Sequence, residues 1–170
     1  MQSDTASCVV TPLQQFAKRF LTGRINWQAI PRTNAIINFG NIISFVIYRK
    51  GQYQVELFIV PHKVSSFTNH RHPNVEVIEF PLSGVNTLFV NGKEAHTDLQ
   101  AQQWLSGEVD SPLVPIHLTD YHSGTATMPY AFLSIQLWLN DISPTSVGLD
   151  WIGAPSSMEQ EALWLLDKVV

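Results

Sequence analysis

The sequence of 170 residues predicts an all-β protein, an antiparallel sandwich or barrel, with a helix near each end. Three observations predict this fold class. Short runs rich in β-branched and aromatic residues fill the middle of the chain, and several of them alternate in polarity. Gly, Pro and Asn separate these runs, as turns require. Helix-capping patterns stand near both ends of the chain.

The first predicted helix spans about residues 12–22. In Thr11-Pro12-Leu13-Gln14 a capping threonine precedes proline at the first helical position, with glutamine three residues after the cap. Apolar residues then recur at helical spacing until Gly23 supplies a stop. Near the other end, Ser156-Ser157 precedes Glu159-Gln160, which predicts a second helix over about 157–168. We expect a single domain over 1–170, with its barrel at about 42–140.

Between these helices the pattern is that of strands joined by turns. Asn91-Gly92 is the strongest hairpin signal. In the late strand, Ser134 and Gln136 share a face with Phe132 and Trp138, and this face either lines a cavity or packs ordinarily. The predicted strands span residues 42–48, 53–59, 75–82, 85–90 and 130–139.

Composition narrows the function classes. The net charge of -4 and the absence of a Lys/Arg run argue against nucleic acid as a partner. Cys8 is the only cysteine, so an intrachain disulfide is excluded and a reducing compartment is expected. No apolar run is long enough to cross a bilayer as a helix. We therefore expect a cytoplasmic protein with no membrane or nucleic-acid partner.

The segment His70-Arg71-His72-Pro73-Asn74-Val75-Glu76 carries the strongest functional signal. Side chains at i and i+2 of a strand share a face, so His70 and His72 can reach one point in space. A turn at Pro73-Asn74 can fold Glu76 back towards the two rings. Imidazole nitrogens and a carboxylate oxygen suit a divalent transition metal. A polar loop at a sheet edge is the alternative interpretation.

From about Gln54 to Leu139 the chain resembles the cupin superfamily. His70, His72 and Glu76 match the His-x-His-x3-Glu order of the first cupin motif, and Gly84 stands close to its closing glycine. The resemblance implies a double-stranded β-helix, or jelly-roll barrel, with a metal held inside by three histidines and a glutamate.

The fourth ligand follows less directly from this resemblance. The usual second motif, Pro-x-Gly-x2-His, is replaced here by Pro115-Ile116-His117-Leu118-Thr119-Asp120. His122 is displaced by two positions from the expected histidine, which keeps its strand parity, so His122 is the predicted ligand and His117 the reserve. The predicted metal ligands are therefore His70, His72, Glu76 and His122.

The ligand set suits Fe(II) first, with Mn, Ni or Zn as alternatives. The function expected from it is a metal-dependent enzyme of the dioxygenase type acting on a small polar molecule; an isomerase or a lyase is also open. The alternatives are a cupin that binds a small ligand without chemistry and a metal-free jelly roll that serves assembly. Low surface charge and the need to cover edge strands favour a homodimer.

Overall fold

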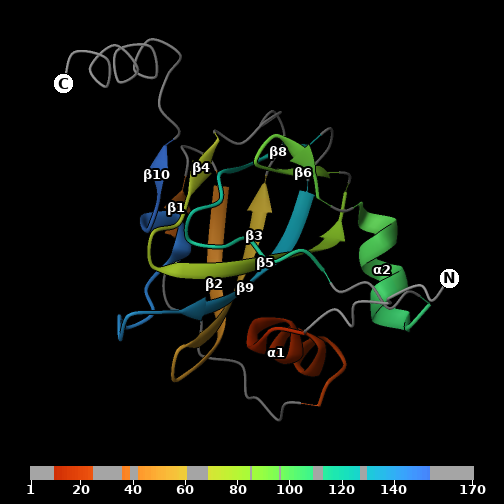
Figure 1. Ribbon diagram of the computed structural model, residues 1–170, viewed down its shortest axis with the longest axis horizontal. Coiled ribbons are helices and arrows are strands. Elements are labelled where there is room, and N and C mark those ends of the chain that lie inside the picture. The colour runs from red at the N-terminus through yellow and green to blue at the C-terminus, as the bar shows by residue number, and fades with distance from the viewer. Residues whose placement is uncertain are drawn as a thin grey trace, which may run out of the picture.

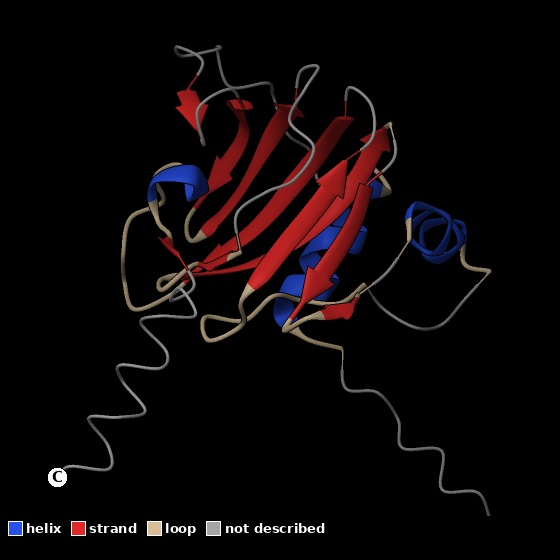
Figure 2. Ribbon diagram, turned by 90° about the horizontal axis from the view of Figure 1, so that it is seen from above, coloured by secondary structure: helices blue, strands red, loops and turns tan. Residues whose placement is uncertain are grey.

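The computed structural model describes residues 10–24, 36–38, 42–60, 69–84, 86–95, 97–108, 113–126 and 130–153. Within these ranges, ten strands form two five-stranded antiparallel sheets, and helices flank them (Figures 1 and 2). This arrangement confirms the predicted all-β jelly-roll fold. The first sheet has the strand order β1-β2-β3-β9-β5, and the second sheet has the order β10-β4-β8-β6-β7.

The strands of the first sheet are β1 (Ile36–Asn38), β2 (Ile42–Lys50), β3 (Tyr53–Val60), β5 (Val75–Ser83) and β9 (Tyr130–Trp138). Those of the second sheet are β4 (His70–Arg71), β6 (Asn86–Val90), β7 (Lys93–Glu94), β8 (His122–Ala126) and β10 (Ile152–Gly153). The predicted hairpin is confirmed, since β6 pairs with β7 across Asn91 and Gly92, both at positive φ.

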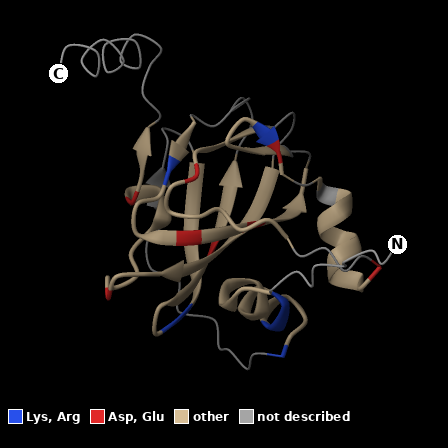
Figure 3. Ribbon diagram, viewed as in Figure 1, with Lys and Arg blue, Asp and Glu red and all other residues tan. Residues whose placement is uncertain are grey.

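Helix α1 (Pro12–Leu21) confirms the first predicted helix and its capping box. The side chain of Thr11 accepts a hydrogen bond from the backbone N–H of Gln14, and the Gln14 side chain accepts one from the backbone N–H of Thr11. Lys18 and Arg19 lie in the last turn, where positive charge opposes the negative end of the helix dipole (Figure 3). The helix predicted over 157–168 lies outside the described residues.

A second helix, α2 (Asp98–Ser106), was not predicted from the sequence. It begins with the same kind of capping box, here formed by Thr97 and Gln100, and it ends at Gly107 in the left-handed conformation. Its buried residues Ala101 and Trp104 belong to the same apolar cluster as α1. A short 3-10 helix, η1 (Val147–Leu149), follows β9.

Strands β3, β5 and β9 of the first sheet are largely buried on both faces, and this explains why β5 and β9 alternate only weakly in polarity. The outer face of this sheet packs against α1 and α2, with the ring of Phe16 stacked on that of Tyr53 at a centroid distance of 4.4 Å. Its inner face lines the barrel. The buried apolar residues of the interior include Phe58, Val77, Leu88, Ile116, Phe132, Trp138 and Val147. Among the described residues, no helix combines the length and apolarity needed to cross a membrane.

Candidate metal centre

Three histidines meet inside the barrel. His70 lies in β4 and pairs directly with His122 of β8, while His72 follows the end of β4. The ring centroids are 4.2 Å apart for His70 and His122, 4.9 Å for His70 and His72, and 5.0 Å for His72 and His122. Each residue offers one ligand nitrogen, and these atoms lie within 4.8 Å of one another. The three side chains can therefore hold one metal ion.

The three rings line a small cavity with few other polar groups. Its volume is about 30 Å³, where one water molecule needs roughly 10–15 Å³ on the same measure. Apolar side chains form much of the wall, and Glu79, Ser123 and Ser134 add polar atoms. The residues lining it are Phe58, His70, His72, Val77, Glu79, His122, Ser123, Gly124, Phe132, Ser134 and Val147.

Burial keeps His72 and His122 of this cluster neutral. It lowers the pKa of His72 to about 3, and the charge that His70 would carry when protonated acts in the same direction. The pKa of His122 is also held well below its usual value, first by burial and then by the charges that His70 and His72 would carry. Neutral imidazole is the form that binds metal.

The hydrogen bonds of His72 and His122 also fit a metal. Nδ1 of His72 lies 2.5 Å from the backbone oxygen of Asp150, and since a carbonyl only accepts, this nitrogen carries the proton. Its Nε2 is then left with a lone pair, which is the usual arrangement for a metal ligand. Nδ1 of His122 is buried and finds no hydrogen-bond partner among the described residues. The residues present therefore fit a divalent ion.

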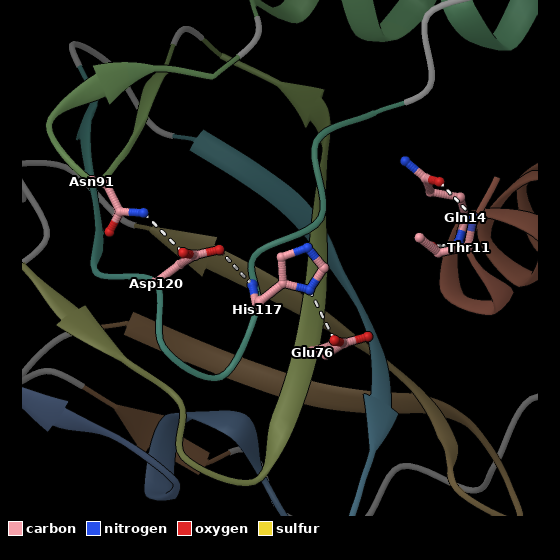
Figure 4. A network of polar contacts seen from close by, with 6 residues as sticks. All are labelled: Thr11, Gln14, Glu76, Asn91, His117 and Asp120. Carbon is pink, nitrogen blue, oxygen red and sulfur yellow. Dashed lines mark hydrogen bonds and ion pairs between the residues drawn. The ribbon is translucent and has the colours of Figure 1, made fainter. Parts of the chain in front are cut away.

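Glu76 is not brought to this cluster, although it was predicted as a ligand. Its Oε1 lies 2.8 Å from Nδ1 of His117, the reserve ligand, whose side chain is 49% exposed. Figure 4 shows this pair, with His117 also donating its backbone N–H to Asp120. Asp120 in turn accepts a hydrogen bond from the side chain of Asn91.

Strand parity explains the position of Glu76. Val75 and Val77 belong to the interior cluster, so the residue between them points to the opposite face of β5. Val77 pairs with Ile116, which places Glu76 beside His117 on that face.

Glu79 is the acidic residue that lines the cavity. It has the same strand parity as Val75 and Val77, and its Oε1 lies 3.8 Å from Nε2 of His122. Burial raises the pKa of the Glu79 carboxyl to about 7. From the sequence, this residue was not among the predicted ligands. Its parity with Val75 and Val77 was the feature that could have placed it in the barrel. Because β5 is apolar on both faces, parity alone did not show which face points inward.

The other sequence predictions near the site have mixed outcomes. Arg71 is not among the residues that line the cavity, and its guanidinium donates to the backbone oxygen of Leu118. Ser134 lines the cavity. Gln136 is fully buried and hydrogen-bonded to neighbouring side chains. Of the two polar residues on this face of β9, Ser134 therefore lines a cavity and Gln136 packs in the interior.

Comparison with known proteins gives structural similarity without a sequence match. No family model and no curated protein matches the sequence. A cupin-2 domain protein of Rhodospirillum rubrum is 14% identical over 83% of this chain and 85% of that chain, with a TM-score of 0.45. A cupin superfamily protein of Desulfitobacterium hafniense is 14% identical over 68% of this chain and 100% of that chain, with a TM-score of 0.42.

KdgF from Halomonas sp. is 11% identical over 70% of this chain and 93% of that chain, with a TM-score of 0.44. Such values do not bear on activity. The order of strands in the two sheets and the apolar interior between them are those of a double-stranded β-helix. Over much of its length, the chain therefore has the fold of a double-stranded β-helix, with three buried histidines inside the barrel.

Proposed function

We propose that the protein is a metal-dependent enzyme of the dioxygenase type that acts on a small polar molecule. His70, His72 and His122 hold the ion in this proposal. The observation that carries it is the convergence of three buried imidazoles at a cavity, with the pKa of His72 and of His122 lowered by burial. Such a cluster is costly as a structural feature, because Nδ1 of His122 is buried without a hydrogen-bond partner among the described residues and has lost its hydrogen bonds to water. A metal ion compensates for that loss.

Fe(II) is the ion we propose for this donor set. Nitrogen and oxygen donors suit first-row divalent metals, and the cavity offers no thiolate that would favour a softer ion. Three protein ligands leave coordination positions open to other molecules. When bound, Fe(II) would act as a Lewis acid and supply the redox chemistry that dioxygen requires.

The chain's own residues have two further parts in this proposal. Phe58, Phe132 and Val147 line the cavity and exclude bulk water, which strengthens electrostatic interactions inside it. Glu79 contacts His122 but does not belong to the cluster of three, so we assign it a proton-holding role beside the centre rather than a ligand position. A carboxyl with a pKa of about 7 can hold or release a proton at neutral pH.

The proposal is tested by loading metal-free protein with Fe(II) without oxygen and measuring bound iron. We expect about one ion per chain, in line with one cluster of three ligands. Oxygen uptake is then followed with a panel of small carboxylic, hydroxy and thiol acids. His72→Ala protein, treated identically, controls for free iron.

Two results would count against this function. Protein that retains no divalent ion would remove the enzyme proposal and favour a ligand-binding or assembly role. Protein that retains iron but consumes no oxygen above the His72→Ala control would remove the dioxygenase assignment. In that case Zn(II), Mn(II) or Ni(II) loading would separate a lyase or isomerase from a non-catalytic binder.

We also propose that the protein forms a homodimer. Exposed apolar side chains gather around the edge strand β10, where Leu149, Trp151 and Ile152 are 67%, 42% and 44% exposed. Burying an apolar patch is favourable, and so is covering a strand edge that has no pairing partner among the described residues. We expect light scattering at micromolar concentration to give about 38 kDa, twice the chain mass of 19.1 kDa. The Trp151→Lys variant should shift the mass towards one chain, and a monomeric wild type would contradict the proposal.

A further inference from the structure

The barrel interior holds a second polar group, separate from the three histidines. β3 and β9 carry inward-facing polar side chains in neighbouring register pairs, Gln54 with Gln136 and Glu56 with Ser134. All four are at most 2% exposed. In an apolar interior each of them needs hydrogen-bond partners, and the partners of Glu56 connect it to the metal site.

Glu56 uses one carboxyl oxygen for two hydrogen bonds. Its Oε2 accepts from Nε2 of Gln136 at 2.8 Å and from the backbone N–H of Val147 at 2.9 Å. Its Oε1 and Oγ of Ser146 are both buried, and neither atom has hydrogen-bond geometry with another described residue. The Ser146 side chain nevertheless lies close enough to the Glu56 carboxyl to lower its pKa. This pattern matches a neutral acid whose carbonyl oxygen accepts twice, and burial raises the Glu56 pKa in agreement.

The contact with Val147 leads to His72. Val147 begins η1, and Asp150 follows the end of that helix. The backbone oxygen of Asp150 is the acceptor for Nδ1 of His72. The other end of segment 145–150 is also attached to the interior, because Gln54 donates to the backbone oxygen of Thr145. Segment 145–150 thus spans from the β3 polar group to a histidine of the site.

The contact with Gln136 leads to the cavity by a second route. Nε2 of Gln136 donates to Glu56 and also to Oγ of Ser134, at 3.1 Å. Oε1 of Gln136 accepts from Gln54 and from the indole of Trp138. The amide orientation is therefore fixed by four hydrogen bonds, and Ser134, which lines the cavity, is held by one of them.

We propose that Glu56 is a positioning residue for the metal centre. It holds segment 145–150 so that the carbonyl of Asp150 keeps the His72 ring protonated at Nδ1, which leaves Nε2 for the ion. The inference rests on the proposed function in taking His72 as a ligand. The state of the His72 ring, however, is a property of the metal-free protein and can be measured without any ion.

The test compares two replacements of Glu56. Glu56→Leu keeps the approximate volume but removes the acceptor for Val147 and Gln136. Glu56→Gln keeps an oxygen that accepts from both. Gln14→Leu is the matched control. It removes the buried hydrogen bond to the backbone oxygen of Leu113 and the capping bond from Thr11, and neither contact touches segment 145–150.

The first measurement is the His72 tautomer in metal-free protein, read from long-range ¹H–¹⁵N couplings by NMR. We expect only the Nδ1–H form in wild type, Glu56→Gln and Gln14→Leu, and a mixture with the Nε2–H form in Glu56→Leu. The second is Co(II) affinity and its visible spectrum. Glu56→Leu should bind Co(II) about 10-fold to 100-fold more weakly, as expected for loss of a group that orients a ligand.

A second variant guards against misfolding of Glu56→Leu. Val147→Pro removes the N–H that donates to Glu56, and proline is tolerated at the first position of a helix. Its effect on the His72 tautomer should match that of Glu56→Leu. The inference is overturned if a folded variant of either kind keeps the Nδ1–H form and wild-type Co(II) affinity. A wild type that binds no Co(II) overturns the proposed function, while the tautomer result still decides the role of Glu56.

Discussion

Replacing His72 with alanine is expected to abolish metal retention while the barrel stays folded. The variant removes one of three nitrogens that lie within 4.8 Å of one another, and two imidazoles alone hold a divalent ion weakly. We expect the affinity to fall by about 100-fold or more. The fold should survive because His72 borders a cavity and because burying it neutral contributes little apolar packing. Bound metal after dialysis, measured by atomic emission, checks the loss.

Two companion variants sharpen this result. His122→Ala should lose metal as His72→Ala does, since its ring belongs to the same cluster. His117→Ala should keep the ion, because His117 lies outside the cavity and pairs with Glu76. Circular dichroism and thermal unfolding establish that all three variants are folded. Metal retained at wild-type level by His72→Ala, or lost by His117→Ala, would contradict the assignment of the site.

Replacing Glu79 with glutamine is expected to stabilise the metal-free protein at pH 8 by up to about 3 kcal/mol and to change it little at pH 5. Burial raises the pKa of Glu79 to about 7 from an ordinary value of 4.5, and each pKa unit corresponds to about 1.4 kcal/mol. The folded state therefore holds a proton between these pH values that the unfolded state has released. Its stability falls as pH rises through 7. Glutamine does not ionise, so the variant escapes this loss.

The buried histidines change stability in the acid range. They are present in the wild type and in Glu79→Gln, so their effect is the same in both proteins. His72 titrates near pH 3 when folded and near 6.5 when unfolded, so acid favours the unfolded state through this window. His122 shifts in the same direction. Urea unfolding with a chelator present, from pH 4 to 9, separates the two effects. Glu76→Gln is the matched control and should show no gain at pH 8. Parallel pH profiles for wild type and Glu79→Gln would contradict a buried, proton-holding Glu79.

The sequence was sufficient for the fold class because its main local signals agreed with one another, although it did not identify every strand or helix α2. The capping box at Thr11, the hairpin at Asn91-Gly92 and the strand runs all lie where they were expected. Helix α2 shows that the same capping signal was present but unused at Thr97. Its apolar stripe is short, with Ala101 and Trp104 as its buried residues, and periodicity therefore gave little support.

The site was predictable in part. The i, i+2 spacing was enough to bring His70 and His72 together, because strand geometry alone decides which face they share. The choice of His122 over His117 followed from parity, and the structure places His122 with the pair. The carboxylate was not predictable in this way. Which face of β5 points inward depends on the helices packed against the other face, and this is a tertiary contact that strand periodicity does not report.

Because β4 pairs with β8 at one position only, a bound metal ion would affect the rigidity of the second sheet. β4 has two residues and meets β8 in a single register pair, whereas β3 and β9 share eight. An ion held by His70 and His72 on one side and His122 on the other would cross-link β4 to β8 where backbone bonds are scarce. Metal binding would then hold β4 against β8 and make the second sheet more rigid. The first sheet, which packs against the helices, would stay as it is. The chemistry of the metal centre and the rigidity of the second sheet around it would then depend on the same three histidine side chains.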